Sequence, residues 1–232
     1  MKKIVLTTYC ILIALFCKAQ FDFTRLHNQM LQENYKEALR IADSCIVNKL
    51  QEDSALYFKG IILIKLNKVR DANKVHKTLV KVYPEFKDAH YLGGLIAYNQ
   101  DDFGRSADEF TRAIRHQPNH VKALYNRSLA SGMLEDYLYA IEDLDKCISE
   151  QPNNSLYYYS RAYWYEYTGN HAAAEKDYKK CIAIDSKYYD AYYGLAYIYQ
   201  NQKEFSKACD VIHDAMNAGS QVADDMKNNF CK

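Results

Sequence analysis

Proline is scarce in this chain, and neither sign of charge dominates. Three prolines among 232 residues, with 49% hydrophobic and 25% charged residues, are the composition of a folded protein that can bury a continuous core. Lysine and arginine number 30 against 29 aspartate and glutamate residues. Because a protein that neutralises several phosphates needs a basic excess, we expect no nucleic-acid partner. A local basic patch is the one alternative that this balance leaves open.

The compact motifs of enzymes and metal sites are also absent. The sequence has no glycine-rich phosphate loop, no HExxH, no CxxC and no Gly-x-Ser-x-Gly. His116 and His120 are four residues apart, but Pro118 between them puts both at a helix boundary, which disfavours a metal site. The nearest pair for acid–base chemistry is Glu166 with His171, on either side of an expected turn. We expect no catalytic residue, no metal and no cofactor; an enzyme with dispersed catalytic groups is the alternative.

The first nineteen residues have the pattern of a secretory signal peptide. A lysine pair precedes the apolar run IVLTTYCILIALFC, and Cys17 and Ala19 are small residues at the two positions that determine cleavage. This run of 14 residues is too short for a transmembrane helix, which needs about 20. We predict a signal peptide over 1–19 and a mature chain from Gln20 without a stable membrane span. The expected location is the periplasm or envelope of a Gram-negative bacterium, and an uncleaved membrane anchor is the alternative.

An aromatic residue recurs every 34 positions, at Tyr57, Tyr91, Tyr125, Tyr159 and Tyr193, and Phe23 extends the series backwards. A period of this length is the signature of a helix-turn-helix solenoid, whose repeats bury their apolar faces only by stacking. No insertion or deletion interrupts the period. It divides the chain into the blocks 19–52, 53–86, 87–120, 121–154, 155–188 and 189–222.

Other positions in the blocks hold the residue types that a pair of helices requires. Small residues dominate two positions, as close approach of two helices demands. The eighth reads Leu26, Gly60, Gly94, Ser128, Ala162 and Ala196, and the twentieth reads Ala38, Ala72, Ser106, Ala140, Ala174 and Ala208. The seventeenth, just after the polar turn, holds the anchors Tyr35, Val69, Phe103, Tyr137, His171 and Phe205. A proline that ends the second helix occupies the thirty-second position at Pro84, Pro118 and Pro152.

This set of positions resembles the tetratricopeptide repeat family, and the resemblance covers essentially the whole chain after residue 19. It implies an all-α fold, a right-handed α-α superhelix (solenoid) of six 34-residue helix-turn-helix repeats over residues 20–232. After Ser220, the apolar residues Val222, Met226 and Phe230 have helical spacing. They predict a capping helix at about 221–231 that covers the apolar end of the last repeat. The resemblance also implies a non-enzymatic scaffold or adaptor for a protein or peptide partner.

Five cysteines follow the predicted cleavage site, and an exported protein can use them in disulfide bonds. Cys45, Cys147 and Cys181 share the twenty-seventh position of their blocks, where they look like small core residues. Equivalent positions on stacked helix pairs are roughly 10 Å apart, whereas a disulfide needs Cα atoms within about 7 Å. Cys209 with Cys231 is the pair that stays open. The odd number leaves at least one thiol free or paired between chains.

Two arginines at the seventh position have acidic partners at a fixed distance. Arg127 precedes Asp143 by 16 residues, and Arg161 precedes Asp177 by the same interval. Each aspartate falls on the second helix of the same repeat, an arrangement that resembles one subtype of the family. We expect an internal ion pair that orients two helices, in preference to an anion-binding site.

The resemblance also assigns residues to the concave face, at positions two, five, nine, twelve and thirteen of each repeat. Mapped onto this sequence, these positions form an apolar and aromatic groove with charges at Lys65, Asp88, Lys122, Glu166 and Asp190. Rigid tyrosines bury much area at low entropic cost and keep a hydroxyl for hydrogen bonding. The expected partner-binding residues are Tyr57, Tyr91, Tyr125, Tyr159, Tyr163, Tyr193 and Tyr197.

The fifth block has a surplus of aromatic residues, which we interpret as a contact surface. It comprises Tyr157, Tyr158, Tyr159, Tyr163, Trp164, Tyr165 and Tyr167. Two alternatives stay open: tyrosine at position five can simply pack between repeats, and an aromatic groove can serve a ligand-sensing or carbohydrate-binding module. Of the basic and amide residues with which co-chaperone members hold a C-terminal carboxylate, only Lys122 and Asn126 match. Capture of a chaperone tail is therefore not expected, and the repeat pattern specifies no oligomeric state.

Overall fold

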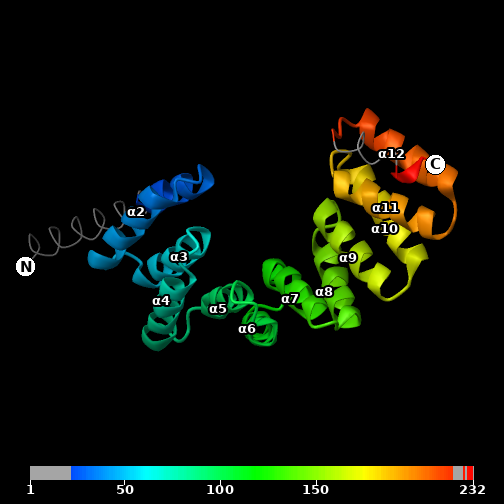
Figure 1. The fold of residues 1–232 in the computed structure, drawn as a ribbon. Coiled ribbons are helices and arrows are strands. Elements are labelled where there is room, and N and C mark those ends of the chain that lie inside the picture. Colours follow the sequence, from blue (N-terminus) through cyan, green and yellow to red (C-terminus); the bar gives the residue numbers. More distant parts are fainter. Residues whose placement is uncertain (1–21, 222–226, 228, 232) are drawn as a thin grey trace, which may run out of the picture. The chain divides into compact units, whose positions relative to one another are not determined.

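The computed structural model describes residues 22–221, 227 and 229–231, and every regular element in them is a helix (Figure 1). Residues 22–31 are helical. They are followed by α2 (Tyr35–Val47), α3 (Glu52–Lys65), α4 (Val69–Val82), α5 (Ala89–Tyr98), α6 (Phe103–His116), α7 (Val121–Met133), α8 (Tyr137–Glu150), α9 (Ser155–Tyr167), α10 (His171–Ile184), α11 (Tyr189–Asn201) and α12 (Phe205–Asn217). The predicted all-α solenoid of helix pairs is confirmed. The signal peptide predicted over 1–19 lies outside the described residues.

The helices belong to two compact halves, an N-terminal half Met1–Gln117 and a C-terminal half Pro118–Lys232. Within each half the helices pack in chain order. From α3 onward, the two helices of one repeat pack against each other, as α3 does with α4 and α9 with α10. The second helix then packs against the first helix of the next repeat, as α4 does with α5 and α8 with α9. This is the stacking that the 34-residue period predicts.

The ends of the helices follow the predicted positions. Every second helix of a repeat begins at the anchor residue, from Tyr35 in α2 to Phe205 in α12. Pro84, Pro118 and Pro152 each lie two residues beyond the last residue of α4, α6 and α8. Proline lacks the backbone N–H that would continue the helix, so it fixes the end of the pair.

Position fifteen of each repeat, in the turn between its two helices, has a left-handed backbone. The φ angles there are 56° at Glu33, 57° at Asn67, 57° at Asp101, 63° at Glu135, 74° at Gly169 and 63° at Lys203. Only Gly169 adopts this conformation without steric cost. The same turn geometry therefore recurs in all six repeats, although the residue type does not.

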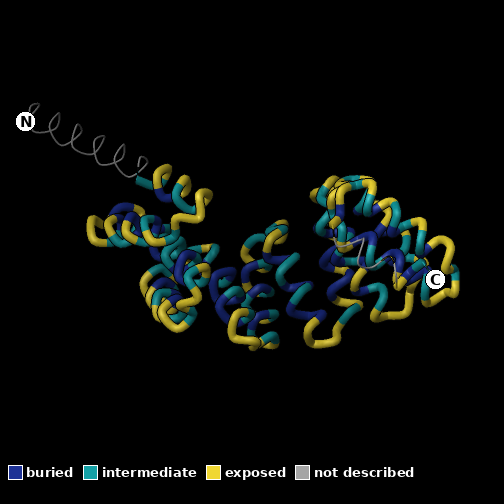
Figure 2. Tube along the Cα trace, turned by 45° about the horizontal axis from the view of Figure 1, so that its top comes forward, coloured by how far each residue is buried: buried dark blue, intermediate teal, exposed yellow. Residues whose placement is uncertain are grey.

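The small residues at positions eight and twenty are buried where two helices meet. Figure 2 shows the buried stretches of the chain in dark blue. All six residues at position twenty are fully buried. At position eight, a Cβ built on Gly60 would lie 2.5 Å from Leu92 Cδ2, and one on Gly94 would lie 2.5 Å from Phe110 Cε1. Because glycine has no side chain, Leu92 and Phe110 can pack directly against the helix backbone at these two positions.

We expect Gly94→Ala to lower the free energy of unfolding by about 1–2 kcal/mol, because the added methyl group overlaps the buried Phe110 ring. Gly104→Ala in α6 is the matched control, since nothing lies within 4 Å of a Cβ at that position. The control should be neutral or stabilise by up to about 1 kcal/mol through helix propensity. Urea denaturation of both variants measures the difference, and equal responses would contradict the close-packing explanation.

Candidate partner-binding site

The five tyrosines of the 34-residue series lie on the first helices of their repeats and are largely packed. Tyr91 is buried, and the other four are half-buried. Ring centroids 5.5–5.8 Å apart join Tyr57 to Phe86, Tyr91 to Phe110, and Tyr125 to Tyr157. Tyr125 thus packs between repeats, the alternative that the sequence left open, whereas Tyr57 and Tyr91 pack against residues of their own repeats. Burial raises the pKa of Tyr57, and the nearby charge of Asp88 adds to this effect.

Four of the predicted residues meet in one cavity of the C-terminal half, which we call the tyrosine pocket. Its volume is about 300 Å³. Its lining is Tyr159, Tyr163 and Glu166 of α9, Tyr178 of α10, Asp190, Tyr193, Gly194 and Tyr197 of α11, and Phe230. Most of these residues hold concave-face positions. Tyr57, Tyr91 and Tyr125 are not among the lining residues.

Local sequence explains why the pocket forms. Tyr159, Tyr163 and Glu166 are spaced by four and three residues, so α9 presents them on one face. Gly194 on α11 has no side chain, and a Cβ there would lie 2.4 Å from Tyr178 Cζ. The fully buried Tyr178 ring thus lies against α11, and its hydroxyl donates a hydrogen bond to Glu166 Oε1.

The tyrosines of the pocket differ in how firmly they are held. Tyr163 and Tyr197 are 38% and 52% exposed. Tyr193 is half-buried, and its hydroxyl is hydrogen-bonded to Ser220 Oγ at 2.8 Å. Tyr159 packs with its ring centroid 4.9 Å from that of Tyr188. In the pocket, Tyr159 and Tyr193 are therefore held by contacts within the fold, while the rings of Tyr163 and Tyr197 are accessible.

The electrostatics of the pocket are those of a half-buried acidic site. Burial raises the pKa of Glu166, and the hydrogen bond from Tyr178 acts against this rise. Burial also raises the pKa of Tyr159, to which the charges of Asp190 and Glu166 contribute. The hydrogen bond with Tyr167, followed by burial, raises the pKa of Tyr163 to about 12. Both tyrosines are therefore neutral at physiological pH.

Sequence models of one family match the repeats along much of the chain. Models described as tetratricopeptide repeat match residues 57–119, 91–155, 156–188 and 177–210. The chain is a tetratricopeptide repeat protein. No curated protein sequence matches it.

Solved structures share the fold of this tetratricopeptide repeat protein. MamA from Desulfovibrio magneticus RS-1 is 19% identical with a TM-score of 0.62, covering 74% of this chain and 97% of that one. A tetratricopeptide repeat protein from Parabacteroides merdae is 15% identical with a TM-score of 0.67, covering 87% and 80%. YrrB, described as a TPR protein with an unusual peptide-binding site, is 15% identical with a TM-score of 0.65, covering 81% and 97%. At these identities the likeness concerns the fold alone.

The aromatic surplus of the fifth tetratricopeptide repeat is only partly a surface, so that interpretation was wrong for three residues. Tyr157, Tyr158 and Trp164 are 6%, 8% and 6% exposed and belong to the core. The indole of Trp164 lies against Gly132, where a Cβ would be 2.3 Å from Trp164 Cζ2. The sequence signal for this burial was glycine at position twelve of the preceding repeat, which leaves room for the indole. Of the surplus, Tyr163 and Tyr167 are the exposed residues.

The predicted arginine–aspartate pairs are confirmed. Arg127 donates from Nε and Nη2 to Asp143 Oδ2 and Oδ1, both at 2.7 Å. Arg161 donates from Nε and Nη2 to Asp177 at 2.6 and 2.8 Å, and from Nη1 to Asp145 Oδ1 at 2.6 Å. Each bidentate pair joins the two helices of one repeat.

Cys209 and Cys231, the pair that the sequence left open, form a disulfide with Cα atoms 4.8 Å apart. His213 Nδ1 lies 3.8 Å from Cys209 Sγ, so these three residues have the composition of a metal site. Both sulfur atoms are bonded to each other, however, which removes the thiolates that a metal would require.

The other three cysteines in the described residues, Cys45, Cys147 and Cys181, are free and buried, as the shared core position predicts. Burial raises the pKa of Cys147 and of Cys181 to about 12. Such thiols are inert at neutral pH because the reactive thiolate is scarce.

The predicted capping helix at about 221–231 lies partly outside the described residues. Of its described part, residues 227, 229 and 230 are helical. Phe230 is 7% exposed and packs in the core cluster of the C-terminal half. Gln200 Nε2 also donates to the backbone oxygen of Asn229 at 3.2 Å. Phe230 thus contributes to the lining of the tyrosine pocket from this segment.

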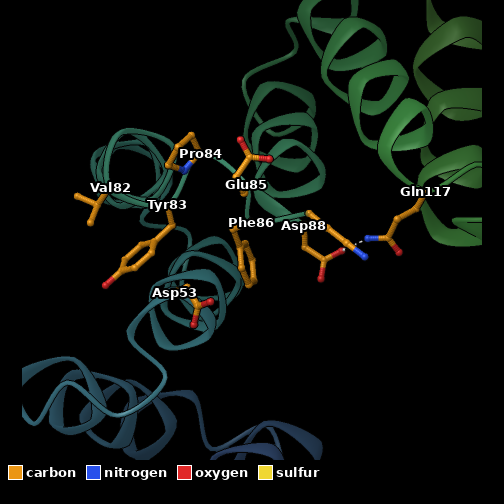
Figure 3. A pocket seen from close by; sticks show the side chains of 9 residues that line it. Asp53, Val82, Tyr83, Pro84, Glu85, Phe86, Asp88 and Gln117 are labelled. Carbon is orange, nitrogen blue, oxygen red and sulfur yellow. Dashed lines mark hydrogen bonds between the residues drawn. The ribbon is translucent and has the colours of Figure 1, made fainter.

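A larger cavity of about 550 Å³ lies in the N-terminal half, around the loop between α4 and α5 (Figure 3). The loop side chains Tyr83, Pro84, Glu85, Phe86 and Asp88 form much of its lining. Gln117 Nε2 donates to Asp88 Oδ1 at 3.4 Å, the dashed line in Figure 3. None of the predicted partner-binding residues lines it.

Proposed function

We propose that this tetratricopeptide repeat protein is a non-enzymatic scaffold that binds a segment of a partner protein at the tyrosine pocket. The observation that carries the proposal is the convergence of Tyr159, Tyr163, Tyr193 and Tyr197 on one cavity in a fold that generally serves protein–protein interaction. Two of these rings are accessible while the others are fixed. Such pre-ordered aromatic residues contribute most of the energy in many interfaces.

The ionisable residues of the pocket support binding over catalysis. Glu166 accepts a hydrogen bond from the buried Tyr178 hydroxyl. In the described part of the chain, no hydrogen bond or ion pair joins it to His171, the partner that an acid–base mechanism would need. Scaffold function requires no such pair.

We further propose that the scaffold acts in the cell envelope after export. The signal-peptide pattern of residues 1–19 supports export, and so does the Cys209–Cys231 disulfide, since disulfides persist in oxidising compartments. No helix in the described part of the chain has both the length and the apolar character to cross a membrane.

The double variant Tyr163→Ala with Tyr197→Ala should capture the partner at least about 30-fold less tightly, because two exposed aromatic contacts are each worth about 1 kcal/mol or more. Tyr163 and Tyr197 are suited to this test because both are exposed. Tyr159 and Tyr193 are less suited, because their truncation would also remove packing or a hydrogen bond within the fold.

The measurement is capture of binding partners from periplasmic and membrane fractions by the mature protein, followed by affinity determination for the partner that is identified. Leu138→Ala is the control, since Leu138 is a 70% exposed residue on α8 outside the pocket. It should bind like the parent. Full capture by a folded Tyr163/Tyr197 variant would show that the partner binds elsewhere.

A further inference from the structure

Both charged residues that the described part of the chain contributes to the lining of the tyrosine pocket are acidic. Among the described residues of its lining, the charged ones are Glu166 and Asp190. Within the described part of the chain, neither carboxylate forms an ion pair with a lysine, arginine or histidine. The hydrogen bond from Tyr178 and the more distant charge of His171 favour the ionised form of Glu166, but they do not offset its lost hydration, because its pKa is still raised. A ligand that brings a positive charge would supply the missing partner.

The same half of the protein shows how this fold holds a guanidinium group. Arg127 pairs with Asp143, and its guanidinium carbon lies 4.8 Å from the centroid of the Tyr139 ring. Arg161 pairs with Asp177 and lies 5.7 Å from the centroid of the Tyr158 ring. A guanidinium group that pairs with a carboxylate and lies over a tyrosine ring therefore occurs twice in these repeats.

The tyrosine pocket offers this combination to a ligand. Tyr163 and Tyr197 supply accessible rings, and Glu166 and Asp190 supply the carboxylates. We propose that the pocket receives an arginine side chain of the partner segment, whose guanidinium pairs with the two carboxylates and stacks on a tyrosine ring. This inference rests on the proposed function and names the chemistry of the residue that is recognised.

Arginine fits these groups better than lysine does. Its planar guanidinium forms two parallel hydrogen bonds with a carboxylate and stacks on an aromatic face, while the lysine ammonium is compact and strongly hydrated. Cation–π contact with tyrosine strengthens when the cation is desolvated. The half-burial of Glu166 provides that desolvation.

The test uses the mature full-length protein and four nine-residue peptides of the same sequence, with arginine, lysine, citrulline or glutamine at the centre. Citrulline keeps the shape of arginine without its charge. Isothermal titration calorimetry should give at least about tenfold tighter binding for the arginine peptide than for the citrulline peptide, as expected for a charge-assisted pair. Equal affinity for these two peptides would overturn the inference. An equally tight lysine peptide would overturn the assignment to arginine.

Two variants assign the effect to the carboxylates. Glu166→Gln and Asp190→Asn should each weaken the arginine peptide about fivefold or more and leave the citrulline peptide unchanged. Glutamine at 166 keeps an acceptor for the Tyr178 hydroxyl. Because Asp190 is exposed, Asp190→Asn tests the inference even if Glu166→Gln affects folding. Glu142→Gln, at an exposed residue of α8, is the charge-matched control and should bind like the parent. Parental affinity in both pocket variants would overturn the inference.

Partner capture separates this inference from the proposed function. Loss of capture in the Tyr163/Tyr197 variant together with normal capture in the Glu166 and Asp190 variants would leave the scaffold function standing and overturn the arginine inference. Normal capture in all of these variants would overturn both. Loss in both sets, with Leu138→Ala and Glu142→Gln unaffected, is the result that we expect.

Discussion

Arg127→Ala is expected to lower the free energy of unfolding by about 3–5 kcal/mol, because it removes the bidentate partner of the buried Asp143 carboxylate and leaves the exposed Lys146, with Nζ 4.0 Å away. Asp143 is 0% exposed and Arg127 is 5% exposed, so water cannot replace the two lost hydrogen bonds. Urea denaturation followed by far-ultraviolet circular dichroism measures the loss. The size of the effect follows from the unpaired charge, since an intact buried ion pair can contribute little.

Two further variants test whether the buried charge of Asp143 causes the loss of stability. Asp71→Ala breaks the exposed pair with Lys74 on α4, and it should change the free energy of unfolding by less than about 1 kcal/mol. Replacing both partners, Arg127→Met with Asp143→Leu, should recover most of the stability that the single variant loses. An Arg127→Ala protein with unchanged stability and lost partner capture would instead indicate a binding role for the arginine.

Cys231→Ser should lower the free energy of unfolding by about 3 kcal/mol under oxidising conditions, because the Cys209–Cys231 bond closes a loop of 22 residues in the unfolded chain. A reductant should lower the melting temperature of the parent and leave the variant unchanged. Thiol titration in denaturant should give three free thiols for the mature parent, at Cys45, Cys147 and Cys181. Five thiols, or a parent that does not respond to reductant, would contradict the bond.

The fold was predictable from the sequence because its determinants repeat in register. The aromatic residue at position five fixes the period, and the small residues that dominate positions eight and twenty fix where two helices meet. The Arg127–Asp143 pair was predictable for the same reason, since an interval of 16 residues brings the partner helix of one repeat alongside. These contacts lie within one repeat or between neighbouring repeats, so position in the repeat specifies them.

The candidate site was predictable only in part, because it depends on what does not repeat. The mapping placed Tyr163 and Tyr197 on the concave face, but it could not separate them from Tyr91, whose ring is covered by Phe110. Phe230 and its disulfide neighbour come from the segment after the last repeat, where the period gives no register. The contacts of this segment with the last repeats depend on how the whole C-terminal half packs, and sequence spacing does not predict them.

Position fifteen of the repeats has a practical consequence for rearranging the chain. Because the backbone makes the same left-handed step there at residues as different as Glu33, Asn67 and Lys203, the six turns are equivalent as cutting points. A chain spliced at this position, with one whole repeat exchanged or duplicated within a half, would rejoin ends whose geometry already matches. The repeats are thus modular at the level of the backbone, whatever side chains each of them contributes to the proposed binding surface.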